Sequence, residues 1–404
     1  MRIVLAATAS YVPPRGGATR SNLIWLDRLA SSGHSCRIVC GPSGEGAALP
    51  HHRSIEVLAV EDPSRRIHVL REQIQELKPD WVLVSSEDLG HGLLREAHQS
   101  APGRVVYLAH TPQFYPFGAA SWNPNPQAAN LVAQSVGVVA IGRHMAEYIE
   151  RELARPAEVI HPPIYGTGPF ANYCNFDRGL VTMINPCAVK GISIFLEVAR
   201  RLPGCEFGYV HGWGTTREDR QALAQLPNVR RVESAPEIGE ILSQTRVLLM
   251  PSLWYEGFGL IVMESMLRGI PVVASDSGGL KEAKQGTGYV IPVRTIERYQ
   301  PVYDEHAMPK PVMPENDAAP WVSSLSGLLH ERGEYQRESD LSRAVATRFV
   351  SRLDAGDFES FLQGLEPMAA GRDAAAAERP HIESLSPEKR ALLLQRLHQR
   401  GTAH

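Results

Sequence analysis

Two glutamates, Glu256 and Glu264, flank a glycine-containing turn between a predicted strand that ends at Pro251 and a predicted helix that begins near Gly259. The first turn of a helix has unpaired backbone N–H groups and a positive dipole end, so this helix start can bind an anion. We expect Glu264, about one turn into the helix, to project toward the same place. Carboxylates on either side of a diphosphate suit a ligand with hydroxyl groups at both ends. A nucleotide sugar, with ribose at one end and hexose at the other, is such a ligand.

The elements that must position this turn alternate between short apolar runs and amphipathic segments. In the first half the apolar runs are largely continuous, as buried parallel strands require. The segment 21–30 carries one helical stripe that stops at Gly33. This alternation predicts a doubly wound α/β domain. The predicted strands of this half are 3–7, 36–40, 55–60, 81–86, 105–109 and 138–141.

A change of domain is predicted where the strand 158–160 runs into Pro162 and Pro163, because proline cannot continue a ladder of hydrogen bonds. The segment 165–177, rich in Gly, Pro, Asn and Tyr, is typical of a linker, and the alternation then restarts. Its predicted strands are 180–184, 206–210, 229–233, 247–251, 271–275 and 289–293, with helices 192–201, 216–226 and 259–267.

The rest of the chain is less regular. The segment 295–320 is predicted to be a long surface loop, and 321–366 to be helical. An alanine-rich tether at 369–380 precedes a short helix, 384–394, with Ser386 as its N-cap and Pro387 as its first residue.

Composition excludes several classes of protein. A net charge of −3 with 21% charged residues lacks the basic excess of a general nucleic-acid surface. No apolar run is long enough to predict an integral membrane segment. The five cysteines form no C-x-x-C pair, which argues against a disulfide framework or a zinc site and predicts a cytoplasmic protein.

The turn and its flanks resemble a known family. The pattern E-G-F-G with a second glutamate at the E-x7-E spacing, followed by the glycine- and proline-containing segment 268–279, strongly resembles the retaining glycosyltransferases of family 4, which have the GT-B fold. The resemblance covers about residues 1–365. It implies that Glu256 contacts the donor sugar and that Glu264 binds the ribose. The donor-binding residues implied on this segment are Gly257, Phe258, Gly259, Leu260 and Glu264.

The resemblance extends to Lys190, which with Gly191 matches the family's E-K-G, whose lysine neutralises the diphosphate. A cation there would stabilise the charge that builds on a departing diphosphate; a solvated lysine is the alternative. Asn185 stands where the family usually has an arginine, and we keep it among the predicted donor-binding residues. One phosphate cation is therefore missing, and Lys190, helix N-termini or an arginine elsewhere must compensate.

The first domain is predicted to contribute Gly16, Gly17 and His110. The two glycines lie in the first strand-to-helix loop, where open α/β sheets bind ligands, although the G-x-G-x-x-G fingerprint of dinucleotides is absent. The resemblance places them beside the diphosphate and places His110, which follows the strand 105–109, against the donor sugar. A plain turn and a buried structural histidine are the alternatives. The aromatic segment 113–122 suits a wall of the cleft for the sugar or the acceptor.

The predicted fold is α/β, with two facing Rossmann-like domains and a central cleft. Its parts are an acceptor-side domain at 1–165, a linker at 166–178, a donor-side domain at 179–345, helices at 346–367 that return to the first domain, and a tether with a short terminal helix at 368–404.

The predicted activity is retaining, metal-independent transfer of a hexose from a nucleoside diphosphate sugar to a small-molecule or carrier-bound acceptor, without a cofactor. Glu256, His110 and Lys190 are its predicted catalytic residues, and the transition state should resemble an oxocarbenium ion. The tail 385–396 resembles segments beside modules of nonribosomal peptide and polyketide synthases, which suggests a natural-product acceptor. The alternatives are a catalytically impaired sugar-binding or docking protein of an assembly line, and a GT-B-fold epimerase or phosphorylase.

Overall fold

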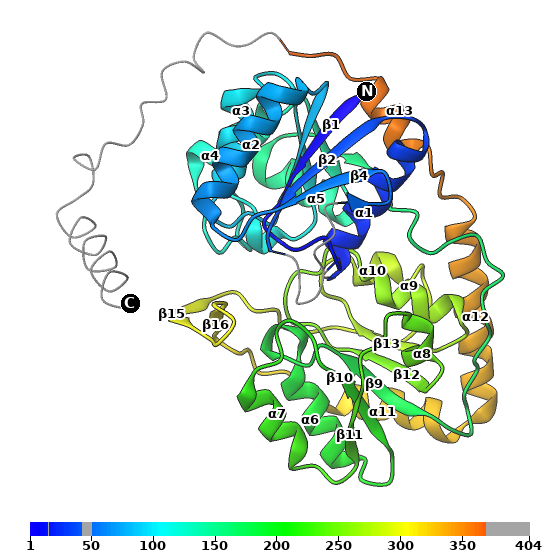
Figure 1. The fold of residues 1–404 in the computed structure, drawn as a ribbon. Coiled ribbons are helices and arrows are strands. Elements are labelled where there is room, and N and C mark those ends of the chain that lie inside the picture. The colour runs from blue at the N-terminus through cyan, green and yellow to red at the C-terminus, as the bar shows by residue number, and fades with distance from the viewer. Residues whose placement is uncertain (15, 43–50, 369–404) are drawn as a thin grey trace. The chain divides into compact units, whose positions relative to one another are not determined.

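The computed structural model describes residues 1–14, 16–42 and 51–368. In this part the chain forms two separate sheets, each covered by helices, and a small two-stranded hairpin (Figure 1). Both larger sheets and their helices belong to one unit, Met1–Pro367. The predicted α/β fold with two Rossmann-like domains is confirmed.

The first sheet has eight strands in the order β3-β4-β2-β1-β5-β6-β7-β8. All neighbours pair in parallel except β3 and β4. The order reverses beside β1, whose neighbours are β2 and β5, so the carboxyl ends of β1 and β5 mark the topological switch point where such sheets bind ligands. The strands are β1 (Arg2–Ala6), β2 (Ser35–Cys40), β3 (His51–His52), β4 (Ile55–Ala59), β5 (Trp81–Ser85), β6 (Val105–Ala109), β7 (Gly137–Ala140) and β8 (Glu158–Val159).

Helices cover this sheet, and several begin at clear local signals. At the start of α2 the side chain of Asp62 accepts from Arg65 N, and proline takes an early position of the helix. Asn125 caps α4 in the same way, through Ala128 N. The helices are α1 (Gly16–Ser31), α2 (Pro63–Leu77), α3 (Gly92–Ser100), η1 (Pro112–Phe114), α4 (Pro126–Ala133) and α5 (Arg143–Leu153).

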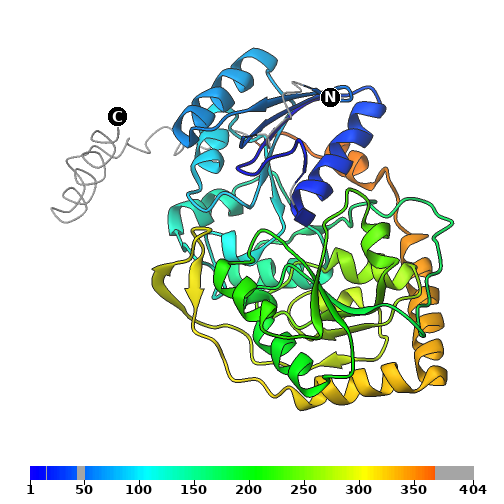
Figure 2. The same cartoon turned by 60° about the horizontal axis from the view of Figure 1, so that its bottom comes forward.

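The second sheet has six parallel strands in the order β11-β10-β9-β12-β13-β14, with its own reversal beside β9. Its strands are β9 (Leu180–Ile184), β10 (Phe207–Val210), β11 (Val229–Val232), β12 (Thr245–Met250), β13 (Val272–Ser275) and β14 (Val290–Ile291). Its helices are η2 (Ala188–Lys190), α6 (Ile192–Arg201), α7 (Arg217–Ala224), α8 (Ile238–Leu242), α9 (Leu260–Leu267), α10 (Leu280–Ala283) and α11 (Ala319–His330), and Figure 2 shows α6 and α7, in green, together on one side of it.

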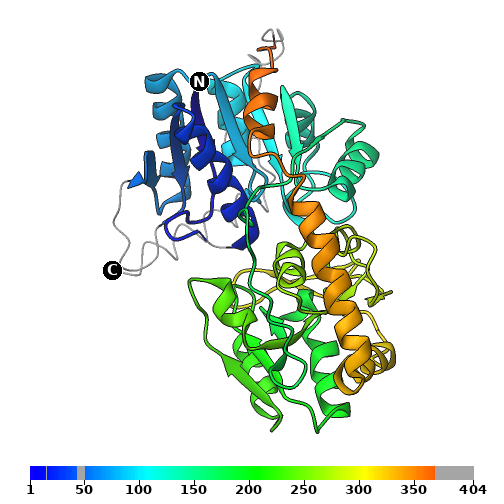
Figure 3. The ribbon, with the colours of Figure 1, turned by 90° about the vertical axis from the view of Figure 1, so that its right-hand side faces the viewer.

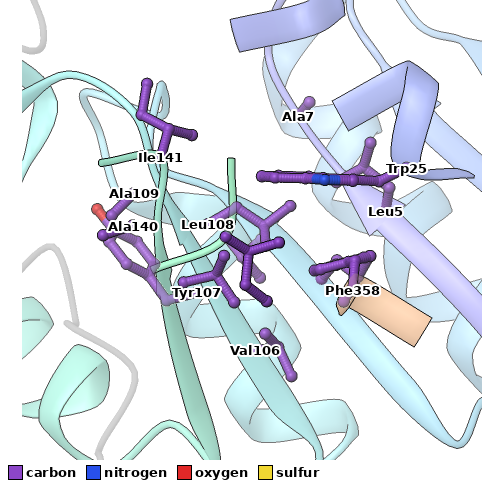
Figure 4. Close-up of a cluster of buried hydrophobic side chains, with 14 of the residues drawn as sticks. Leu5, Ala7, Trp25, Val106, Tyr107, Leu108, Ala109, Ala140, Ile141 and Phe358 are labelled. Atoms are coloured by element: carbon purple, nitrogen blue, oxygen red, sulfur yellow. The ribbon is translucent and has the colours of Figure 1, made fainter. Parts of the chain in front are cut away.

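The chain returns to the first sheet after the second is complete. The long helix α12 (Arg332–Val350) runs from the second sheet toward the first (Figure 3). The short helix α13 (Asp357–Gln363) then places Phe358 against Trp25 of α1, with ring centroids 4.7 Å apart and an interplanar angle of 16°. Figure 4 shows this stacked pair in the core beside β1 and β6. Apolar burial of this kind attaches α13 to the first sheet.

Two predictions from the sequence need correction. The segment 295–320 contains a hairpin, β15 (Tyr299–Tyr303) and β16 (Pro309–Pro311), in which the Asp304 carboxylate accepts from His306 N and Met308 N at the turn. The prolines of this segment led to the prediction of a loop, but proline is tolerated in a strand that lacks a neighbouring strand on one side. The first helix begins at Gly16 rather than at residue 21.

The predicted tether and terminal helix at 369–394 lie outside the described residues. Within the described ranges no helix combines the length and hydropathy needed to cross a membrane. The same ranges hold no cluster of three or more metal-ligating side chains.

Candidate active site

The turn that carries Glu256 is built from glycines that admit close backbone contact. A Cβ at Gly257 would overlap the carbonyl oxygen of His110 in the first domain. Gly259, the residue before α9, has φ +96°, a left-handed conformation that favours glycine. Gly279 donates its N–H to Glu256 O at 2.8 Å, and a Cβ there would overlap Gly257 O. The sequence therefore needs glycine here to bring the turn against the first domain.

Glu256 is buried and holds two donors. One carboxylate oxygen, Oε1, accepts from Lys190 Nζ at 2.6 Å and from Ser252 Oγ at 2.5 Å. Lys190 Nζ also lies 4.4 Å from the centre of the Trp254 ring, a cation–π distance. The structure thus brings together two of the predicted site residues, and it adds Ser252 and Trp254, which the sequence analysis did not single out.

Glu264 contacts the other domain. Its side chain is 5% exposed, and Oε1 accepts from Arg20 Nη2 at 2.9 Å. Arg20 lies one turn into α1, as Glu264 lies one turn into α9. The two helices also meet at their starts, since a Cβ at Gly17 would lie 3.1 Å from Leu260 Cδ1. We call the set Arg20, Lys190, Ser252, Glu256 and Glu264, with the start of α9, the candidate site.

The two predicted glycines of the first domain stand at the first turn of α1, not in a loop before it. Gly16 has φ +86°, and Gly17 follows within the helix. The helix can begin this early because glycine tolerates the left-handed conformation at its first position. Gly17 therefore faces the start of α9, and the positive ends of two helices lie near each other.

His110 follows β6 and is 2% exposed. Its Nε2 lies 2.7 Å from Asn22 Oδ1, and its backbone N–H donates to Ser86 Oγ at 3.0 Å. Burial lowers the pKa of His110 to about 3, so the ring is neutral near pH 7. With Asn22 as acceptor, Nε2 carries the hydrogen, and the buried Nδ1, which has no hydrogen-bond partner among the described residues, is left to accept one. The backbone carbonyl of His110 lies against Gly257, at the turn that carries Glu256.

Asn185 follows β9 with φ +58° and holds the next loop in place. Its Oδ1 accepts from Gly214 N at 3.0 Å and from Thr215 Oγ1 at 3.4 Å. Its Nδ2 is buried and has no hydrogen-bond partner within the part of the chain that the structure describes. A neutral amide used in this way stabilises a loop and supplies no positive charge, so the cation that the sequence analysis found missing is not replaced at this position.

A third carboxylate connects the domains outside the candidate site. The oxygens of Glu282 on α10 accept from the backbone N–H groups of Arg143 and His144, each at 3.1 Å. These groups belong to the first turn of α5, so the carboxylate caps a helix of the other domain. His144 also stacks on Tyr255, with ring centroids 4.8 Å apart, beside Glu256. No local pattern in the sequence indicates this contact.

A half-buried acid lies on the side of the first domain. Glu87 follows β5, next to the strand that ends before His110, and its backbone carbonyl accepts from Thr8 Oγ1. Burial raises the pKa of the Glu87 carboxyl to about 7. No hydrogen bond or ion pair of this carboxyl occurs within the described part of the chain.

Aromatic rings from both domains meet near Lys190. Trp122 of the predicted wall lies 5.3 Å from Phe114, 5.4 Å from Tyr299 and 6.3 Å from Trp254, measured between ring centroids. The predicted wall segment 113–122 is therefore continuous with the indole that covers Lys190.

Two family models match this chain, one for each domain. The model described as Glycosyltransferase Family 4 matches residues 15–165, and the model described as Glycosyl transferases group 1 matches residues 179–300. No curated protein sequence matches the chain.

Solved structures with the same fold cover nearly the whole chain. HepE of Anabaena, solved in complex with UDP and glucose, is 16% identical with a TM-score of 0.63, over 89% of this chain and 98% of that one. Sucrose-phosphate synthase of Thermosynechococcus elongatus is 14% identical with a TM-score of 0.66, over 90% and 97% of the two chains. WaaG, a glycosyltransferase involved in lipopolysaccharide biosynthesis, is 14% identical with a TM-score of 0.63, over 91% and 100%. At such identities the likeness concerns the fold.

Proposed function

Because this chain is a family 4-like glycosyltransferase with the GT-B fold, we propose that it transfers a sugar from a nucleoside diphosphate sugar to a hydroxyl group of an acceptor, with retention of the anomeric configuration. The observation that carries this proposal is the pairing in the candidate site. Two buried carboxylates flank the start of α9, and each holds one cation, Lys190 or Arg20.

This arrangement fits a nucleotide sugar at both ends. The N-terminal N–H groups of α9 attract the diphosphate, which lies between the two glutamates. Glu256 then accepts from hydroxyls of the sugar and Glu264 from hydroxyls of the ribose, so each buried carboxylate keeps hydrogen-bond donors when its cation moves. The neutral Nδ1 of His110, a residue whose backbone lies against the same turn, accepts from a further hydroxyl of the sugar.

In the proposed reaction the bond between the anomeric carbon and the diphosphate oxygen breaks, and the electron pair leaves with the diphosphate. Lys190 and the start of α9 stabilise that growing negative charge. The acceptor oxygen forms the new bond on the face that the diphosphate leaves, and its proton passes to the departing phosphate oxygen. Retention follows, because attack and departure use one face of the sugar.

We place the acceptor on the side of the first domain, against the aromatic rings Phe114 and Trp122. An aromatic wall suits an acceptor with an apolar or planar face. A natural product as acceptor is the finer form of this proposal, and it rests on the resemblance of the tail alone. Cationic side chains take the charge-neutralising role that a metal has in other transferases, so we propose a reaction without a required metal.

Binding is the first test. A panel of nucleoside diphosphate sugars is screened by thermal shift, and the true donor at about 100 times its Kd should stabilise the protein by about 2.7 kcal/mol. Glu256→Gln should reduce turnover with the identified donor by at least about tenfold, because a charged acceptor for the sugar is lost. Glu72→Gln, an exposed position on α2, is the matched control and should leave turnover unchanged.

The products decide the reaction class. NMR of the purified product should show the anomeric configuration of the donor. Free sugar phosphate, or an epimerised nucleotide sugar formed without an acceptor, would instead identify a phosphorylase or an epimerase. A protein in which Glu256→Gln changes neither donor binding nor turnover would contradict the assignment of this site.

A further inference from the structure

The first domain supplies a cation to the candidate site that the family resemblance does not assign. Arg20 donates to Glu264 at 2.9 Å, while the position expected to hold an arginine in the second domain is occupied by Asn185, whose side chain holds a loop. Resting on the function proposed above, we propose that Arg20 is the second diphosphate-binding cation of this enzyme, and that it exchanges Glu264 for a phosphate oxygen when the donor binds.

The distances make this exchange feasible. Glu264 lies four residues after Leu260, where α9 begins, which corresponds to about 6 Å along the helix axis. The guanidinium of Arg20 is bonded to that carboxylate, so it lies about one helical turn from the N–H groups expected to bind the diphosphate. Rotation of a long, flexible side chain covers such a distance.

The exposed fractions of the two side chains indicate that Arg20, rather than Glu264, moves when the donor binds. The Arg20 side chain is 38% exposed, whereas the Glu264 side chain is 5% exposed. A pair in which one member faces solvent can open by moving that member outward, while the buried carboxylate stays in place. Glu264 also stands on a helix whose residues Val262 to Leu267 are buried, which fixes its position.

The charges explain why the exchange is favourable. Lys190, Arg20, Glu256 and Glu264 sum to zero, so the site without donor is balanced. A buried carboxylate that loses its cation without replacement is strongly destabilised, but the two hydroxyls of a ribose supply donors to Glu264. The freed guanidinium can then bind the diphosphate with two parallel hydrogen bonds, a geometry that lysine cannot provide.

A competing explanation for the contact between Arg20 and Glu264 predicts the opposite change in nucleotide affinity when Arg20 is removed. If Arg20 only occupies Glu264 in the absence of donor, it competes with the ribose, and its removal should strengthen nucleotide binding. If Arg20 binds the diphosphate, its removal should weaken the binding of any nucleotide that has a second phosphate. The comparison between a nucleoside diphosphate and the matching monophosphate therefore separates the two.

The experiment measures Kd for both nucleotides, with the base found in the donor screen, by calorimetry on the full chain. Arg20→Ala should weaken diphosphate binding by about 10- to 100-fold, because a charge-assisted hydrogen bond is lost, and should leave monophosphate binding unchanged or stronger. Arg20→Lys should fall between the wild type and Arg20→Ala. Arg28→Ala, an exposed position near the end of the same helix, should change neither value and serves as the control.

Equal or tighter diphosphate binding by Arg20→Ala would overturn the inference and leave Arg20 as a competitor of the ribose. If Arg20→Ala does not fold, Arg20→Gln, which keeps a polar side chain but removes the charge, decides, because full diphosphate affinity in that variant would equally overturn the inference. Failure of the wild-type protein to bind any nucleotide would contradict the proposed function itself, which this result distinguishes from a failure of Arg20 alone.

Discussion

Replacement of Glu87 by glutamine should stabilise the protein at pH 8 and have no effect on stability near pH 4. Glu87 follows β5, a central strand of the first sheet, and burial raises the pKa of its carboxyl from 4.5 to about 7. A raised carboxyl pKa means that the folded protein disfavours the ionised form. Ionisation of Glu87 therefore costs folding free energy, and glutamine, which cannot ionise, removes that cost.

The size of the stability change follows from the difference between the pKa of Glu87 in the folded and the unfolded chain. Below about pH 4.5 the carboxyl is protonated in both the folded and the unfolded chain, so it adds no pH dependence. Between about pH 4.5 and 7 the unfolded chain loses the proton first, and stability falls by about 1.4 kcal/mol per pH unit. Above pH 7 both states are ionised and the loss is complete, at up to about 3 kcal/mol.

Thermal unfolding of the wild type and Glu87→Gln, followed by calorimetry from pH 4.5 to 8, measures this contribution. The difference in Tm should grow with pH in favour of the variant and level off above pH 7. Glu76→Gln, an exposed position on α2, is the control and should show no such gain. A difference that stays constant across this range would refute the reasoning, because the carboxyl would then ionise equally in both states.

Two further predictions concern the contacts between the domains. Gly257→Ala should lower the free energy of unfolding by about 1–3 kcal/mol and weaken donor binding, because its Cβ would overlap His110 O. Calorimetry measures the loss of stability. The control Gly204→Ala should show none, because a Cβ at that position has no neighbour within 4 Å. Glu282→Ala should lower the free energy of unfolding by about 2 kcal/mol through loss of the cap on α5, and Glu282→Gln should lower it by less. A denaturant titration measures both variants, and Lys281→Ala, a change at the exposed neighbouring residue, should have no effect in it. Equal stability of all three variants would show that the cap does not stabilise the protein.

The fold and the second-domain half of the site could be predicted because their signals are local. Glu256 and Glu264 stand at one spacing on one strand-turn-helix unit, and the glycines between them are required by the backbone of that unit. The parallel strands are buried runs with little alternation, which the sequence displays directly. Each of these features depends on residues within about ten positions of each other.

The remaining features depend on contacts between distant residues. Arg20 meets Glu264 across 244 positions, and Glu282 meets the start of α5 across 138. An exposed arginine on an amphipathic helix has the same local pattern whether or not a carboxylate of another domain faces it. The hairpin β15–β16 was not predicted for a related reason, since within the described residues its strands pair with each other alone, and both contain prolines.

The difference between contacts within one domain and contacts between the two domains explains how a site of this kind can be both stable and open to a ligand. Lys190 and Glu256 belong to one domain, so their contact survives any relative movement of the two domains. Arg20 and Glu264 belong to different domains, and that contact exists only while the starts of α1 and α9 lie together. A donor that replaces the second contact with bonds to both partners keeps the domains joined through the ligand. Assembly of the complete site would then depend on the donor, which is what a transferase needs in order to exclude water from a bound, reactive sugar.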